Sequence, residues 1–241
     1  MLIVSSCTTT DSNPDINQKI LLKKIITKNL NNNSVINITD FEYNGNKISK
    51  SLSQNNKILF TYDAHLITNI KIFDLSNTLI AKYLFNYENN NLIESIYKTL
   101  SSNVCEKRLY TYNINGTVSF TYYIGDLITQ STLFKTGIIT IQNDEVVFVE
   151  VQNYLDLSNL KTTYTYDNQY NPNKNILGID KLKVEQDRVG GVFKNTILSS
   201  SIYNSSQYFT TDFTYIYNAN GYPSTSSYIF NGINIKSEYF Y

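Results

Sequence analysis

Few side chains in this sequence of 241 residues could carry out chemistry. It has one histidine, His65, and two cysteines, Cys7 and Cys105. A zinc site usually needs several His or Cys ligands. A serine-histidine-acid triad would have to use His65, yet the sequence has no Gly-x-Ser-x-Gly turn to hold a nucleophile. The sequence therefore predicts no metal site and no cofactor. His65 is interpreted as a strand or turn residue, and an enzyme is not expected.

Acidic residues offer the remaining route to catalysis, because a glycosidase needs only two carboxylates brought together by the fold. Asp63, Asp167 and Asp212 adjoin aromatic residues at expected turns. An aspartate there caps the turn through the backbone, and no pair of carboxylates stands out. A hydrolase hidden in the loops remains a second alternative function, which a substrate screen with a His65→Ala variant would test.

Composition favours strands and disfavours one class of partner. The chain has 20 basic and 20 acidic residues, and no basic cluster of the kind that neutralises phosphates, so nucleic acid is not an expected partner. The 21 Tyr and 12 Phe, with abundant Ile and Thr, are typical of β-strands. Only 9 Gly are present, so asparagine is expected at many turn positions that need a positive φ.

One short pattern recurs along the chain: an aromatic residue, any residue, tyrosine, then Asn, Asp or Glu and a polar turn. Both rings lie on one face of a strand, because side chains alternate with a period of two. The rings either pack across neighbouring strands or form an exposed surface that stacks on sugar rings or other flat ligands. The copies begin at Phe41, Phe60, Phe85, Tyr110, Tyr164 and Tyr215.

These repeats predict an all-β fold: an antiparallel meander of successive hairpins with about ten to fourteen strands. The strands form one large twisted, curled sheet, which can close into a half-closed barrel. Residues 20–30 and 35–39 are expected to pair, and residues 138–141 and 146–151 form the best-buried hairpin. Terminal strands should be covered, short or charged, and Lys236 and Glu238 fit the last of these.

The hairpin pattern fails in an irregular insertion at about 172–195. This stretch is densely charged, which indicates either a solvated insertion or a loop that recognises a protein or glycan partner. The candidate recognition residues are Asp180, Lys183, Glu185, Asp187 and Arg188.

The first seven residues end in Val4-Ser5-Ser6-Cys7, which resembles the end of a bacterial lipoprotein signal peptide. The resemblance implies a lipid on Cys7. Only six residues precede Cys7, whereas a full signal has an apolar region of roughly 7–15 residues, so residues 1–7 are interpreted as a truncated signal. The alternatives are a short frayed terminus with an exposed thiol and a Cys7–Cys105 disulfide. Residues 8–19 form a polar tether, and residues 20–241 one domain. With Cys7 lipidated, Cys105 is expected to be a small buried residue.

The repeats also resemble the YD/RHS-type repeats of bacterial surface proteins. The resemblance lies in Phe-Thr-Tyr-Asp at 60–63, Tyr-Thr-Tyr-Asp at 164–167 and Tyr-x-Tyr-Asn-x-x-Gly at 215–221. The whole chain is similar to small lipoproteins of Bacteroidetes with degenerate YD-like repeats. The resemblance covers roughly residues 38–241 and carries over no catalytic residue.

We therefore expect a non-enzymatic, lipid-anchored binding or structural module of the cell envelope, attached to the outer membrane through its lipid on Cys7. Its expected state is a monomer with a protein or glycan ligand. The alternative is a carrier of a lipid or small apolar ligand inside the curled sheet. An open-ended cavity lined by Ile, Leu and Phe would favour that alternative, and an interior filled by side chains would exclude it.

Overall fold

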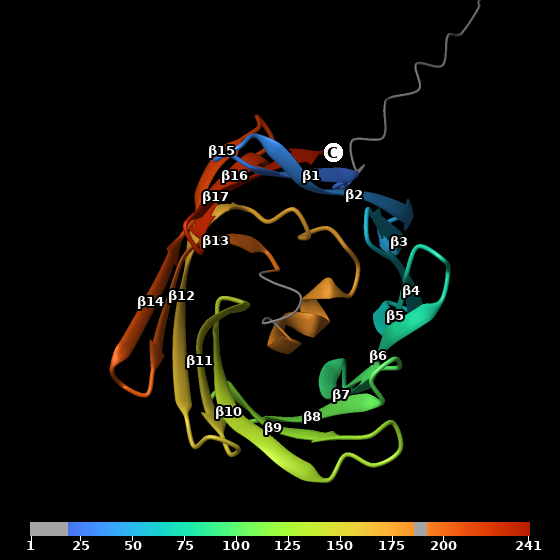
Figure 1. Ribbon diagram of the computed structural model, residues 1–241, viewed down its shortest axis with the longest axis vertical. Coiled ribbons are helices and arrows are strands. Elements are labelled where there is room, and N and C mark those ends of the chain that lie inside the picture. The colour runs from blue at the N-terminus through green and yellow to red at the C-terminus, as the bar shows by residue number, and fades with distance from the viewer. Residues whose placement is uncertain (1–18, 186–191) are drawn as a thin grey trace, which may run out of the picture.

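The computed structural model of the protein describes residues 19–185 and 192–241 (Figure 1). Over these residues the fold is a 17-stranded antiparallel sheet with one short 3-10 helix, η1 (Ile179–Glu185). The predicted signal and nearly all of the predicted tether lie outside the described residues, as do Asp187 and Arg188. No helix in the described part of the chain is long and apolar enough to cross a membrane.

The strands follow one another along the chain with short turns between most of them. They are β1 (Lys24–Asn29), β2 (Ser34–Asn44), β3 (Lys47–Ser53), β4 (Lys57–Asp63), β5 (Leu66–Phe73), β6 (Leu79–Glu88), β7 (Asn91–Thr99), β8 (Val104–Tyr112), β9 (Thr117–Gly125), β10 (Thr132–Gln142), β11 (Glu145–Asn153), β12 (Asn159–Tyr170), β13 (Lys194–Tyr203), β14 (Gln207–Asp212), β15 (Thr214–Tyr217), β16 (Pro223–Phe230) and β17 (Ile233–Phe240).

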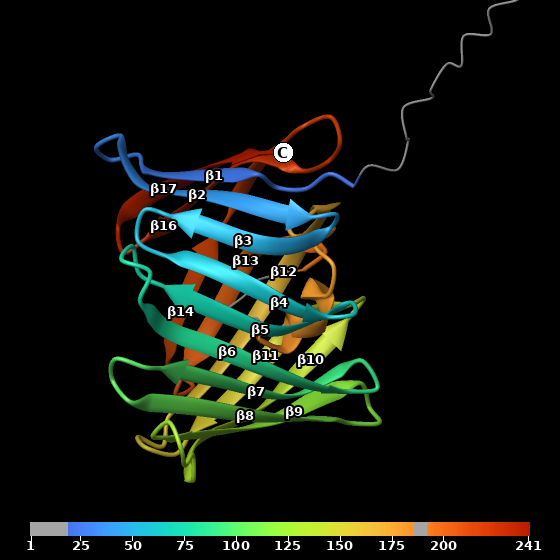
Figure 2. The same ribbon diagram turned by 90° about the vertical axis from the view of Figure 1, so that its right-hand side faces the viewer.

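The sheet closes into a barrel that has one gap. β1 pairs with both β2 and β17, which joins the two ends of the meander. Residue pairs join each strand to the next around the described ring, over only three residues between β3 and β4, but none joins β14 to β15. The view down the axis shows the ring, and the view from the side shows the tilted strands (Figures 1 and 2). The predicted all-β meander and the hairpins at 20–39 and 138–151 are confirmed. The expected strand number was too low, and closure is more complete than half.

The terminal strands are covered, which is one of the three predicted alternatives, because β17 pairs with β1. The interpretation of Lys236 and Glu238 as charges that protect a free edge is therefore wrong. Glu238 lies opposite Ile26 of β1, and its carboxylate accepts hydrogen bonds from Lys28 at 2.9 and 3.0 Å. Lys236 lies 3.3 Å from the same carboxylate. The charges therefore pair across closed strands, where opposite charges stabilise the sheet.

Asparagine shapes many of the turns, as composition predicted. Positive φ angles, which most side chains avoid, occur at Asn33, Asn77, Asn89, Asn90, Asn103, Asn143, Asn204 and Asn231. Several two-residue turns are followed by a β-bulge, as between β6 and β7, where the register shifts beside Tyr87. A bulge bends the strand and increases its twist, which helps a long meander to curl.

The two faces of the barrel wall differ in chemistry. The face toward the lumen carries the buried apolar residues, which include Ile67, Phe85 and Leu92. The outer face carries cross-strand ion pairs, such as Lys24 with Asp40 at 3.1 Å and Lys161 with Glu150 at 3.0 Å. This division follows from the period-two alternation of each strand.

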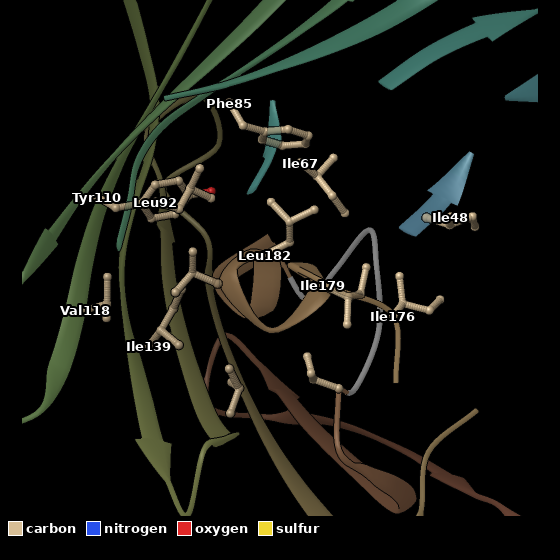
Figure 3. Close-up of a cluster of buried hydrophobic side chains, with 13 residues drawn as sticks. Ile48, Ile67, Phe85, Leu92, Tyr110, Val118, Ile139, Ile176, Ile179 and Leu182 are labelled. Atoms are coloured by element: carbon tan, nitrogen blue, oxygen red, sulfur yellow. The ribbon is translucent and has the colours of Figure 1, made fainter. Parts of the chain in front are cut away.

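The lumen contains part of the insertion, which we call the plug and define as residues 171–185. Its Ile176, Ile179 and Leu182 are buried against the wall, and Figure 3 shows the wall side chains gathered around them. The interpretation of this stretch as a solvated insertion is therefore wrong. A ring of 16–18 strands leaves a lumen wider than its own side chains fill, and the plug occupies part of that space.

Candidate functional site

The recurring tyrosines point into the lumen and tie the wall together. The second aromatic of several copies donates its hydroxyl to a carbonyl about twenty residues earlier in the chain. Tyr87 bonds to Ile67 at 2.7 Å, and Tyr166 bonds to Val146 at 2.6 Å. Tyr43 bonds to Leu22 at 2.7 Å. Each acceptor residue is almost fully buried, so the hydroxyl pairs with a carbonyl that water does not reach.

This arrangement decides between the two interpretations of the aromatic pattern. Phe41, Tyr43, Phe60 and Tyr62 pack against the buried core instead of forming an exposed ladder. Burial raises the pKa of Tyr62 to about 12. The repeat is a unit of the scaffold, and the rings of these copies are not available as a platform for sugars.

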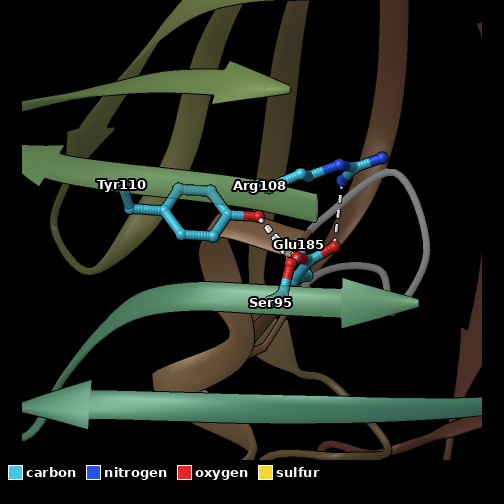
Figure 4. Close-up of polar contacts among 4 residues, drawn as sticks. All are labelled: Ser95, Arg108, Tyr110 and Glu185. Carbon is cyan, nitrogen blue, oxygen red and sulfur yellow. Dashed lines mark hydrogen bonds and ion pairs between the residues drawn. The ribbon is translucent and has the colours of Figure 1, made fainter. Parts of the chain in front are cut away.

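A buried ion pair fixes one end of the plug (Figure 4). Glu185, the last residue of η1, is 2% exposed and lies 2.9 Å from Nη1 of Arg108. Its other oxygen accepts hydrogen bonds from Tyr110 at 2.5 Å and from Ser95. Burial, with the negative charge of Glu185 beside it, raises the pKa of Tyr110 well above its usual value. Tyr110 is therefore a hydroxyl donor at neutral pH.

A second buried carboxylate holds the chain where it returns to the wall. Glu145, at the start of β11, is 3% exposed. It accepts the backbone N–H groups of Phe193 at 2.8 Å and Lys194 at 2.6 Å. Burial raises the pKa of the Glu145 carboxyl, and these hydrogen bonds oppose the rise.

Asp167 anchors the same region from β12. It accepts the backbone N–H of Asn195 at 3.2 Å and the hydroxyl of Tyr217. Gln169 donates its backbone N–H to the same carboxylate at 3.0 Å, as expected for an aspartate that caps a turn. Asp167 thus caps its turn and also ties β13 and β15 to it.

Further contacts seat the plug against the turns at one end of the barrel. The N–H of Leu177 donates to the carbonyl of Asn46 at 2.9 Å. Gly178 has a φ of +78° and lies against the carbonyl of His65, where a Cβ would come within 2.4 Å of the oxygen. Only glycine fits this position, because both the backbone conformation and the space exclude a side chain.

The structure separates the five predicted recognition residues. Asp180 and Lys183 are partly exposed and paired, Asp180 with Lys181 at 2.8 Å and Lys183 with Asp144 at 3.2 Å. Glu185 is buried and faces the wall. Asp187 and Arg188 lie outside the described residues. Glu185 is bound by residues of the wall, Arg108, Tyr110 and Ser95. A role in recognition stays a prediction for the other four residues.

The plug leaves a cavity of about 170 Å³ beside it. The cavity lies between Val184 of the plug and the lumen face of β8–β12. Most of its lining is apolar, and it includes Phe120, Ile139 and Leu160. Apolar cavities of about 150 Å³ bind molecules the size of benzene, so this space is large enough for a small ligand.

Two cations border the cavity, and they differ in their surroundings. Arg108 is bound to Glu185 and stacks on the ring of Tyr122, with 4.7 Å from Cζ to the ring centroid. Lys135 places its Nζ 4.6 Å from the centroid of Phe134 and 5.8 Å from that of Tyr122. Within the part of the chain that the structure describes, Lys135 has no ion pair. Its ammonium is held at the cavity by aromatic faces.

The sequence contains a pattern from which the lumen-facing positions of both cations could have been predicted. Arg108 has the same parity as Tyr110 and Tyr112, so it lies on the face that carries the rings. Lys135 has the same parity as Ile139 and Ile141, which are directed at the core. A charged residue in register with lumen-facing residues indicates a buried ion pair or a binding site. Glu185 gave no comparable signal, because no regular period surrounds it.

The residues considered for catalysis are placed as turn and packing residues. His65 lies in the turn between β4 and β5, with Nε2 3.1 Å from Oδ1 of Asn90. Cys105 is buried with a free thiol, as predicted, and burial raises its pKa. Among residues 19–185 and 192–241, no three His, Cys, Asp or Glu side chains gather to hold a metal ion. The buried carboxylates Glu145 and Glu185 are both engaged by donors of the protein.

Comparison with known proteins identifies the fold. No family model and no curated protein matches the sequence. A solved structure of a porin-like protein from Bacteroides vulgatus is 13% identical, covers 92% of this chain and 99% of its own, and has a TM-score of 0.63. A porin-like protein from Bacteroides uniformis is 14% identical over 91% of this chain and 96% of its own, with a TM-score of 0.52. This chain shares their fold. At these identities the likeness extends to architecture alone.

Proposed function

We propose that this chain is a non-enzymatic binding protein of the cell envelope that holds, in its barrel, a small anion with an apolar tail. The observation that carries the proposal is the cavity of about 170 Å³ between the plug and β8–β12. Its lining by Ile139, Leu160 and Phe120 has the chemistry expected of a carrier site. The plug fills the neighbouring space, so the ligand would sit in a side pocket of the lumen.

The lining indicates the class of ligand. Val149, Val151 and Leu160 supply an apolar wall, and Lys135 supplies a positive charge at its border. A carboxylate with a short aliphatic or aromatic tail matches both features. A buried six-carbon tail contributes about 5 kcal/mol at roughly 0.8 kcal/mol per CH₂. Association costs at least about 4 kcal/mol, so the tail alone binds very weakly, and measurable binding in the millimolar range requires a further contribution from the charge of Lys135.

Titration calorimetry with octanoate and octanol tests this site. Octanoate is expected to bind wild-type protein, and Lys135→Met is expected to weaken octanoate by about tenfold while leaving octanol unchanged. Lys161→Met, which removes a charge from the outer face, serves as the matched control. Val151→Phe should fill the cavity and abolish the binding of both octanoate and octanol. Failure of both ligands to bind wild-type protein would show that the cavity is not a site.

The faces of the wall argue against a pore, although the two solved structures are described as porin-like. A barrel wall that faces lipid carries an apolar outer band and a polar lumen. Here the outer face mixes ion pairs such as Lys50 with Glu42 with exposed apolar residues such as Leu109 and Ile138, and the lumen carries the apolar core. This distribution favours an outer wall that faces water.

Attachment to the membrane would come from the lipid proposed on Cys7. The support is the Val4-Ser5-Ser6-Cys7 motif and the polar residues that follow it, together with a fold known from proteins of Bacteroides. Two or more acyl chains anchor a protein stably, whereas one does not. The proposed location is the outer membrane, with the barrel facing the periplasm or the cell surface.

Metabolic labelling with a palmitate analogue tests the anchor. The chain is expressed behind a complete lipoprotein signal in a Bacteroides host, next to a Cys7→Ser variant. Wild-type protein is expected to be labelled and to fractionate with membranes, and the variant to be unlabelled and released. An unlabelled wild-type protein would contradict the proposed lipid anchor. It would not bear on the lumen site, which the titration with octanoate tests separately.

A further inference from the structure

The barrel wall is interrupted between β14 and β16. Among the described residues, β14 pairs only with β13, from Tyr203↔Gln207 to Leu198↔Asp212, and β15 pairs only with β16. The two are halves of one strand separated by Phe213, and each half has a ladder on one side. Figures 1 and 2 show β14 diverging from β16 toward the β13–β14 turn. We call this gap the seam.

Backbone groups line the seam on both sides. The N–H of Phe213 donates to the carbonyl of Ile197 in β13 at 2.9 Å. Alternate residues of an antiparallel strand direct their N–H and C=O to opposite sides. The backbone groups of Tyr208, Thr210 and Asp212 are therefore directed into the seam. On the other wall, a two-residue turn joins Phe230 to Ile233, so the backbone groups of Phe230 are directed to β17. By the same alternation, the backbone groups of Ile229 are directed into the seam.

A cavity of about 460 Å³ occupies the seam. One wall is formed by Thr210, Thr211 and Asp212 of β14, and the other by residues of β16 and β17 that include Tyr228 and Ile235. β14 and β16 lie close together where β14 passes into β15 and diverge toward the β13–β14 turn, so an added strand could form a ladder with the free edge of β14 in the wider part.

The edge of β14 lacks the features that normally protect a free strand. Natural edges are blunted by charged residues, above all lysine, by proline or by a bulge, whereas β14 (Gln-Tyr-Phe-Thr-Thr-Asp) has one charged residue, at its end, and neither lysine nor proline. Large apolar side chains flank the gap instead: Tyr208 is 71% exposed and Ile229 is 64% exposed. Strands β1 and β17 carry Lys24 and Lys236, yet they are fully paired. At the seam, by contrast, the edge of β14 is left without a paired strand within the described part of the chain.

We propose that the seam binds an extended segment of a partner protein, which adds as a strand antiparallel to β14. The ladder with β14 would carry the binding, and on the β16 side Ile229 offers its backbone groups to the other edge of the segment. Asp212 is the charged residue of the lining and has no ion pair within the described residues. Charge complementarity therefore places a basic residue near the N-terminus of the incoming segment. A second copy of β14 would place no basic residue opposite Asp212, because its sequence contains none.

The probe is the acetylated, fluorescently labelled peptide Lys-Val-Thr-Val-Thr-Val, whose lysine falls opposite Asp212 and whose valines face the lumen side. Fluorescence anisotropy should report binding to wild-type protein. Thr210→Pro removes one N–H from the seam and is expected to weaken binding by about tenfold. Thr210→Ala keeps the N–H and should bind within about twofold of wild type. A peptide N-methylated at alternate residues should lose binding.

Three outcomes would overturn the proposal. One is no binding of the peptide up to about 1 mM, the weak end of specific association. Another is equal binding to wild type and to a Thr210→Pro variant shown by circular dichroism to be folded. The third is a dimer in sedimentation that Thr210→Pro dissociates, which would assign the seam to a second copy. Octanoate binding in the lumen is measured separately and should not change in either Thr210 variant.

Discussion

Replacing Arg108 by methionine tests how the plug is held in the barrel. Glu185 is 2% exposed and bonds to Arg108 at 2.9 Å. Two unit charges about 4 Å apart attract by about 4 kcal/mol at an effective dielectric constant of about 20. Removing one member of a buried pair costs about 3–5 kcal/mol, because the other charge stays buried. Tyr110 and Ser95 still donate to Glu185, so we expect Arg108→Met to lower the free energy of unfolding by about 3 kcal/mol.

A double-mutant cycle in urea measures the pair itself. Glu185→Leu and the double variant complete the cycle, and the expected coupling is about 2–3 kcal/mol. Lys24→Met provides the control, because its partner Asp40 is half exposed and such pairs contribute only about 0–1 kcal/mol. A loss below about 1 kcal/mol in Arg108→Met, or additivity within about 0.5 kcal/mol, would refute the view that this pair fixes the plug.

Three further predictions concern other buried groups. Tyr87→Phe leaves the Ile67 carbonyl without its donor, and urea unfolding should show a loss of about 1–3 kcal/mol; no loss would mean that the hydroxyl contributes nothing. Because burial raises the pKa of Glu145 above 4.5, its contribution to stability is complete below 4.5 and is lost as pH rises through the raised value. Relative to Glu145→Gln, wild-type protein should therefore lose stability as pH rises above 4.5, and parallel curves would contradict this. In a Cys7→Ser variant, Cys105 should react with a thiol reagent much more slowly in the folded than in the unfolded protein, whereas equal rates would contradict its burial.

The wall of this barrel follows from local sequence, which is why it could be predicted. Strand alternation and turn chemistry act between near neighbours. The hairpin of β6 and β7, for example, is predicted by Phe85-Asn86-Tyr87 and by the asparagines that follow Glu88. The period of two placed both rings of each copy on one face, but it did not indicate what the tyrosine hydroxyls would bond to. Their acceptors, the carbonyls one hairpin earlier, could not be specified, because they depend on the register across the wall.

Closure and the plug depend on contacts between distant residues, and local patterns do not encode them. Lys24 pairs with Phe240 at the junction of β1 and β17, and the sequence around either residue does not indicate that the two will pair. Dense charge in the insertion indicated solvent, since charges are rarely buried unless paired. The partner of Glu185 lies on β8, 77 residues away. The rule about buried charge held, but the pairing that satisfied it could only be seen in the folded barrel.

The plug and the proposed ligand site have a common physical origin. A ring of 17 strands encloses more space than its inward side chains can fill, so the lumen needs additional chain. Polar anchors at Glu185 and Glu145 fix where that chain lies, while its apolar residues bury against one part of the wall. Val184 is the last of these residues, and the cavity begins beside it. The anchors therefore determine both what the plug covers and what it leaves open, so variants that loosen the Arg108–Glu185 pair should change octanoate binding as well as stability.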